Sequence, residues 1–128
     1  MKLHHLGYVF DKNKKPYFDK KYKKKIVDKV QQNYIYFDYS NKLNLWIEYI
    51  LPMNKSSTVY KFSLKKSNNI HHFGFYTSSI SKFTKVLQKN NYLLINKFNI
   101  FVPAFGGKVK TAFFYKSKEL VELISKDE

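Results

Sequence analysis

Apolar and polar residues alternate along several short segments of the chain, a pattern that predicts β-strands with one buried face. These segments are also rich in aromatic and β-branched residues. They predict strands at 3–10, 25–30, 33–39, 45–51, 70–77, 92–95, 108–115 and 119–124. A different spacing follows residues 78–79, both serine, where Ile80, Phe83 and Leu87 recur at helical intervals. Because serine is a good helix N-cap, this segment predicts an amphipathic helix that ends near residues 90–91.

Three less regular segments separate these elements. Residues 11–24 are rich in lysine and have poor apolar spacing, which predicts a short, weak helix. Residues 53–69 are mostly polar and predict a linker that includes one helical turn. Residues 96–107 end in Gly106-Gly107 and predict a loop, although several of them are apolar.

The chain repeats one pair of motifs in its two halves. "LHHLGYVF" at residues 3–10 is repeated as "IHHFGFYT" at 70–77, and "WIEYI" at 46–50 is repeated as "LVELI" at 120–124. The second histidines of the two doublets are 67 positions apart (72 − 5), and the glutamates are 74 apart (122 − 48). A nearly constant offset over half the chain indicates an internal duplication.

The duplication predicts an α+β fold built from two tandem βαβββ modules. We expect a single domain, residues 1–128, with a first module at 1–52, a linker at 53–69 and a second module at 70–128. A chain of this length is large enough for one hydrophobic core and marginal for two independent ones.

Composition excludes several classes of protein. With 44% hydrophobic and 19% aromatic residues, the chain is expected to fold rather than to be disordered. It has no apolar run long enough to cross a membrane, and its first residues lack the apolar core of a secretory signal. There is no cysteine, hence no disulfide or thiolate site. We therefore expect a cytoplasmic protein of bacterial type.

The formal net charge of +15 raises the question of nucleic-acid binding. All 24 basic residues are lysine, however, whereas base readout and bidentate phosphate contacts favour arginine. The lysines are also scattered over most of the chain, so we expect no specific nucleic-acid partner. Some of them could instead contact an anionic small molecule, such as a phosphate-bearing thioester.

Each half of the chain offers one histidine of a doublet and one glutamate from an apolar strand. An ionised carboxylate is costly in such a strand unless it is paired or bound to a metal. Imidazole and carboxylate together suit divalent Zn, Ni, Co, Fe or Mn. If the halves pack about a pseudo-twofold axis, Glu48, Glu122 and one histidine of each doublet converge on one point. The alternative is that these are ordinary hydrogen-bonded histidines and solvent-facing glutamates. Strand periodicity does not decide which histidine of each doublet points inward.

These motifs, with "VPAFGG" at 102–107, resemble the vicinal oxygen chelate superfamily over nearly the whole chain. That superfamily includes glyoxalase I, methylmalonyl-CoA epimerase, extradiol dioxygenases and bleomycin-resistance proteins, and the small bacterial epimerase-like or glyoxalase-like members are the most similar. The resemblance implies a curved, mostly antiparallel sheet around a central cavity. It also implies a divalent metal ion bound by the second histidine of each doublet and both glutamates: His5, Glu48, His72 and Glu122.

The resemblance implies a metal-dependent lyase, isomerase or epimerase that abstracts a proton next to a metal-polarised carbonyl. Two departures stand out: 11–25 is dominated by lysine and tyrosine, and 31–37 lacks the carboxylate base of the epimerases. Glu122 then remains as the catalytic base. The alternative is a non-catalytic small-molecule binding or resistance protein on the same fold, a function that flat aromatic rings would suit.

We expect a small-molecule substrate to contact Trp46, Phe105 and Lys108. Both halves lie in one chain, so a monomer could complete the site, whereas the resemblance to proteins that often dimerise also allows a homodimer.

Overall fold

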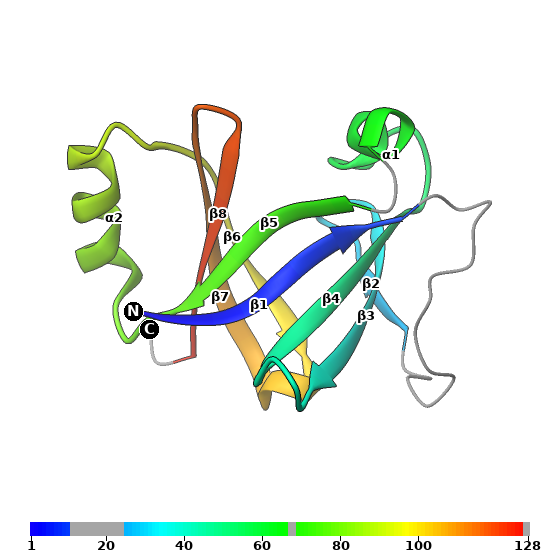
Figure 1. Ribbon diagram of the computed structural model, residues 1–128, viewed down its shortest axis with the longest axis horizontal. Coiled ribbons are helices and arrows are strands. Elements are labelled where there is room, and N and C mark those ends of the chain that lie inside the picture. The colour runs from blue at the N-terminus through cyan, green and yellow to red at the C-terminus, as the bar shows by residue number, and fades with distance from the viewer. Residues whose placement is uncertain (11–24, 67–68, 127–128) are drawn as a thin grey trace. The chain divides into compact units, whose positions relative to one another are not determined.

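The computed structural model describes residues 1–10, 25–66 and 69–126 of the 128-residue chain (Figure 1). The chain divides into two compact units. The N-terminal unit is His5–His71, and the C-terminal unit combines Met1–His4 with His72–Glu128. Both boundaries between the units therefore fall inside a His-His doublet.

The N-terminal unit is built on a sheet in which the strands follow the order β2-β3-β4-β1. Its elements are β1 (Lys2–Val9, of which the first three residues belong to the other unit), β2 (Ile26–Asp28), β3 (Asn33–Ser40), β4 (Leu45–Pro52) and α1 (Tyr60–Lys66). β1 pairs with β4 in parallel, and the pairs β2–β3 and β3–β4 are antiparallel.

The core of this unit lies between the sheet and the segment after β4. Val9, Ile50 and Val59 form a buried cluster, and Phe62 of α1 packs against it. The segment before α1 is fixed by buried hydrogen bonds, because the Ser57 hydroxyl donates to the Asn33 side chain and accepts from the Val59 backbone. Polar side chains of the predicted linker, such as Ser57, therefore hold this segment to the sheet.

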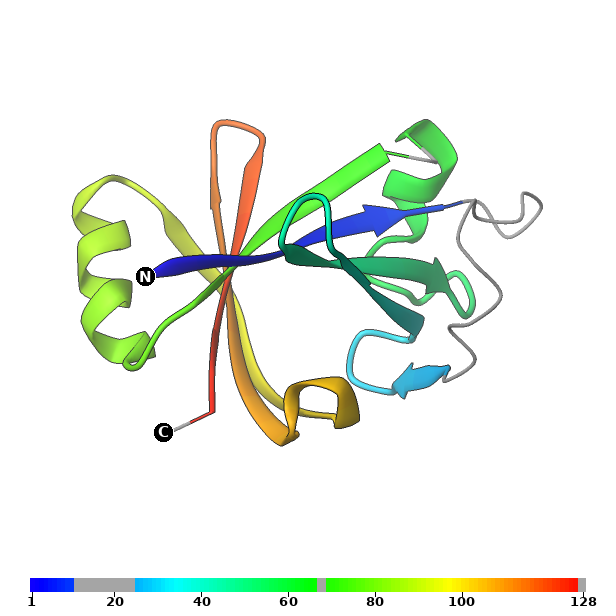
Figure 2. The ribbon, with the colours of Figure 1, turned by 60° about the horizontal axis from the view of Figure 1, so that its bottom comes forward.

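The C-terminal unit repeats this plan with the strand order β5-β8-β7-β6. Its elements are β5 (Asn69–Tyr76, of which the first three residues belong to the other unit), α2 (Ile80–Lys89), β6 (Leu93–Val102), the 3-10 turn η1 (Pro103–Phe105), β7 (Gly107–Lys116) and β8 (Glu119–Ser125). β5 pairs with β8 in parallel, whereas β6–β7 and β7–β8 are antiparallel. Figure 2 shows β6 and β7 as a long hairpin joined by η1.

Helix α2 covers one face of the C-terminal sheet. Its apolar side, with Ile80 and Leu87, packs on Ala112, Phe114 and Leu123 in a fully buried cluster. The other face of β7 is left to Thr111 and Phe113, because side chains alternate along a strand. The helix thus provides the unit's core on one side and leaves the opposite side of the sheet to polar and aromatic residues.

The N-cap of α2 is Ser79, one of the two serines that the sequence offered as caps. Its backbone is extended and its hydroxyl accepts a hydrogen bond from the Lys82 amide at 3.2 Å. We expect Ser79→Ala to lower the free energy of unfolding by about 1 kcal/mol, because an N–H of the first turn loses its acceptor. Chemical denaturation measures this loss, with Ser78→Ala at the neighbouring exposed position as control. Equal losses in the two variants would contradict the capping role.

The prediction of a strand at 92–95 followed by a loop at 96–107 is wrong. β6 continues to Val102, and only Pro103–Phe105 form a turn. The side chains from Asn96 to Val102 alternate between partly buried and exposed positions, so the strand period was present. Two asparagines and a register shift between Leu94 and Asn96 masked it.

The predicted strand at 25–30 is shorter in the structure. β2 ends at Asp28, whose carboxylate accepts hydrogen bonds from the backbone amides of Val30 and Gln31 and so forms a turn. The short helix expected at 11–24 lies outside the described residues. The α+β class and the repeated, mostly antiparallel arrangement of strands are confirmed.

Candidate functional site

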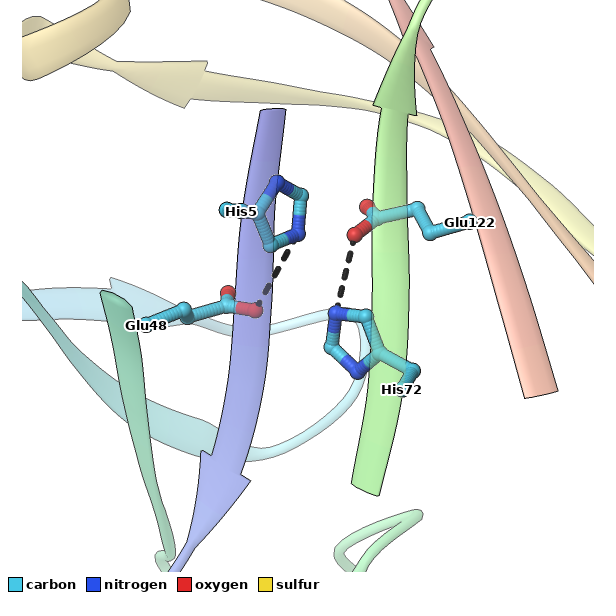
Figure 3. Close-up of side chains that lie close together, drawn as sticks. All are labelled: His5, Glu48, His72 and Glu122. Carbon is cyan, nitrogen blue, oxygen red and sulfur yellow. Dashed lines mark ion pairs between the residues drawn. The ribbon is translucent and has the colours of Figure 1, made fainter. Parts of the chain in front are cut away.

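The N-terminal unit contains a buried pair made by His5 of β1 and Glu48 of β4. The two strands are neighbours, and Gly7, two residues after His5, lies directly opposite Glu48. The His5 Nε2 and Glu48 Oε1 atoms are 3.7 Å apart (Figure 3). His5 is 2% exposed and Glu48 is 8% exposed. The parallel register thus brings an imidazole and a carboxylate together in the interior.

The C-terminal unit contains the same pair in the same register. Gly74, two residues after His72, lies opposite Glu122 in the parallel β5–β8 pair. The His72 Nε2 and Glu122 Oε1 atoms are 3.1 Å apart (Figure 3). The exposures match those of the first pair, 2% for the histidine and 8% for the glutamate. The duplication seen in the sequence therefore extends to side-chain geometry.

A phenylalanine lies against the histidine of each pair. Phe37 is opposite Glu48 in the β3–β4 pair, and its ring meets His5 edge to face at 6.4 Å. Phe113 is opposite Glu122 in the β7–β8 pair and meets the His72 ring edge to face at 5.3 Å. These edge-to-face contacts favour one orientation of each imidazole, and both histidines are themselves buried. Neither phenylalanine was predicted from the sequence to lie at the site.

The first histidine of each doublet has a different environment. The His4 ring meets Phe105 edge to face at 4.5 Å, and the His71 ring meets Phe62 at 4.9 Å. Both are less buried than His5 and His72. Consecutive residues of a strand point to opposite faces, so only one member of each doublet can face the glutamate.

The predicted substrate-binding residues fall in three different places. Trp46 is two residues from Glu48 on β4, and its ring contacts Phe37 and Tyr39, so it shares the face of the His5–Glu48 pair. Phe105 is buried in η1 against His4. Lys108 is exposed and alternates with Val109, which places it on the face of β7 that carries Ala112. The positions of Phe105 and Lys108 give no support to their predicted role.

No carboxylate lies on the segment 31–37. The next residue with one, Asp38, is opposite Ile47 and thus on the other face of β3 from Phe37. Burial, together with the charge of Asp38, raises the pKa of Tyr49 on that other face. Asp38 therefore does not supply a second acid beside the His5–Glu48 pair.

The donor atoms of each pair are of the kinds that bind a divalent metal ion. Each pair offers one imidazole nitrogen and one carboxylate oxygen, the ligands that Zn and similar ions take in proteins. Each glutamate is also buried, and a buried carboxylate is costly without a compensating positive charge. The residues present are therefore compatible with the metal that the resemblance implies.

No protein-family model matches the chain, and no curated protein sequence matches it.

Among the described residues, no helix has the length and hydropathy needed to span a membrane.

Solved structures, by contrast, resemble the whole chain. A methylmalonyl-CoA epimerase from Mycobacterium tuberculosis has a TM-score of 0.74 at 15% identity, covering 97% of this chain and 87% of that one. A hypothetical protein from Bacillus halodurans C-125 has a TM-score of 0.73 at 23% identity, with 99% and 95% covered. A Streptomyces coelicolor methylmalonyl-CoA epimerase in complex with 2-nitronate-propionyl-CoA has a TM-score of 0.72 at 13% identity, with 98% and 94% covered. At such identities the similarity establishes the fold alone, and the chain shares the fold of these solved proteins.

Proposed function

We propose that His5, Glu48, His72 and Glu122 together bind one divalent metal ion. The observation that carries this proposal is the repetition of a buried His–Glu pair at the same strand register in both units. One pair alone offers two ligands, whereas a stable divalent site of this type takes three or four protein ligands. The matched Phe37 and Phe113 rings support the proposal, because dry surroundings strengthen binding of a cation by carboxylates.

We propose further that the protein is an enzyme of the lyase, isomerase or epimerase class that abstracts a proton next to a carbonyl. A bound divalent ion would polarise the carbonyl and stabilise the charge that develops on its oxygen. Glu122 is proposed as the base that takes the proton, and His5, Glu48 and His72 as residues that bind and orient. All four side chains are buried, which would limit the access of water to groups bound beside them.

The proposed substrate is a small thioester. Its support is the fold similarity to methylmalonyl-CoA epimerases, one of which was solved with methylmalonyl-CoA. Trp46 is the proposed aromatic contact, since its ring lies on the face of the His5–Glu48 pair. The scattered lysines would favour the approach of an anionic substrate.

A second candidate is a non-catalytic small-molecule binding protein. One observation favours it: the face of β3 beside His5 carries Asn33, Ile35 and Phe37 and no acid. An epimerase that protonates both faces of a planar intermediate needs two acids, whereas abstraction and return of one proton needs one. Exchange of the proton with solvent, without inversion, is therefore the minimal activity to seek.

The test combines metal analysis with isotope exchange. Purified, untagged protein is expected to contain about one transition-metal ion per chain after loading. With methylmalonyl-CoA in deuterated water, mass spectrometry should then show exchange of the α-proton that stops on chelation. A loaded protein that binds the thioester without exchange would favour the binding protein. Absence of metal after loading would contradict the metal site itself.

A further inference from the structure

The two His–Glu pairs differ at one matched position. In the β3–β4 pair, Ile35 lies two residues from Phe37, and in the β7–β8 pair, Thr111 lies two residues from Phe113. Ile35 and Thr111 thus occupy the same place relative to the phenylalanine and share its face of the sheet. Both are buried, Thr111 at 1% exposure. The duplication therefore places an apolar side chain in one unit where it places a hydroxyl in the other.

The Thr111 hydroxyl contacts the glutamate of its own pair. It donates a hydrogen bond to Glu122 Oε2, while Glu122 Oε1 is 3.1 Å from His72 Nε2. Each oxygen of this carboxylate therefore has its own partner. The corresponding histidine–glutamate distance in the N-terminal unit, where Ile35 replaces the hydroxyl, is longer at 3.7 Å.

We propose that Thr111 is a positioning residue that fixes the Glu122 carboxylate and presents its Oε1 atom for chemistry. This inference rests on the proposed metal site, in which Glu122 is both ligand and base. The terminal torsion of a glutamate is broad, so a carboxylate without a fixed donor rotates readily. Threonine is β-branched and stiff at χ1, so its buried hydroxyl is a donor in a defined place.

The energetic cost of a buried hydroxyl supports this role. A hydroxyl inside a protein is unfavourable unless it is hydrogen-bonded, and valine would fill nearly the same space without that cost. The strand could carry an aliphatic residue here, as β3 does with Ile35. The hydroxyl is therefore explained by its bond to Glu122, and partners of this kind commonly contribute 10–100-fold to metal affinity.

The experiment compares Thr111→Val, Thr111→Ser and Ile35→Val by competition with a chromophoric chelator for Zn. Thr111→Val is expected to weaken Zn binding about 10–100-fold, because the carboxylate is no longer held in place. Thr111→Ser keeps the hydroxyl and should restore most of the affinity. Ile35→Val, a conservative change at the matched position of the other unit, should leave it unchanged. Wild-type affinity in Thr111→Val, or an equal loss in Ile35→Val, would overturn the inference.

A second readout uses the metal-free protein and separates this inference from the proposed function. Long-range ¹H–¹⁵N spectra report the ring nitrogens of each histidine. Thr111→Val should shift the His72 nitrogens, which lie beside Glu122, and leave those of His5 in place as an internal reference. Unchanged His72 nitrogens would contradict the positioning role. Failure of the wild type to bind any metal would contradict the proposed function, whereas these spectra would still test Thr111.

Discussion

The variant His72→Ala is expected to fold and to lose its metal ion. His72 is buried, lies 3.1 Å from Glu122, and is one of two proposed nitrogen ligands. Without it, the site loses one of its two nitrogen ligands, and the buried Glu122 carboxylate loses its imidazole partner. Metal content, measured by elemental analysis after loading and desalting, should fall from about one ion per chain to a small fraction of that. His5→Ala should have the same effect, because His5 occupies the matched position in the other unit.

The doublets provide the control within the same strands. His71→Ala and His4→Ala remove imidazoles that pack against Phe62 and Phe105 rather than facing a glutamate. These variants should keep their metal, even if the lost ring contacts lower stability. Circular dichroism shows whether each variant is folded. Equal loss of metal from His71→Ala and His72→Ala would contradict the proposed ligand set.

The second large effect is expected from Glu122→Gln. Glutamine keeps the shape of the side chain but cannot accept the α-proton, so proton exchange on a thioester should fall about 10²–10⁴-fold. The assay is deuterium incorporation, measured at metal concentrations that saturate the variant. Metal stoichiometry is checked in the same sample, so that loss of the ion and loss of the base are told apart.

Glu48→Gln is the matched substitution in the other unit. Glu48 has the same register and burial as Glu122, but its proposed role is to bind the metal. The Glu48→Gln variant should therefore need more metal for saturation and then exchange the proton at a rate near that of the wild type. If Glu48→Gln abolishes exchange and Glu122→Gln does not, the two glutamates have the opposite roles.

Strand periodicity predicted most of the fold. The strands at 33–39, 45–51, 70–77 and 119–124 agree with the structure within a residue or two, because one face of each is buried. A serine cap for α2 was also predicted, since two serines precede a clear apolar stripe, and the structure places it at Ser79. The full length of β6 could not be predicted, because asparagines are typical of loops. The outward-facing positions of β6 also carry apolar residues such as Phe101, which obscures the alternation.

The candidate site was harder to predict from the sequence than the fold. The sequence singled out Glu48 and Glu122 because few carboxylates lie within apolar strands. Strand alternation could not choose within the His-His doublets, because it defines two faces without saying which is inward, and only the family resemblance indicated His5 and His72. No sequence pattern indicated a role for Thr111. Its role depends on the register of β7 against β8, and a lone threonine in a strand is ordinary.

The unit boundaries inside the doublets bear on how this chain could be divided. Met1–His4 belong to the unit formed by the second repeat, and the opening of β5 belongs to the unit formed by the first. The first repeat expressed alone would therefore lack the opening residues of β5. It would also carry the opening residues of β1 without the unit to which they belong. Two such fragments would regain complete units only by exchanging these ends, as domain-swapped copies do. The half-chain is thus the unit of sequence repetition, whereas the compact units of the structure do not coincide with it.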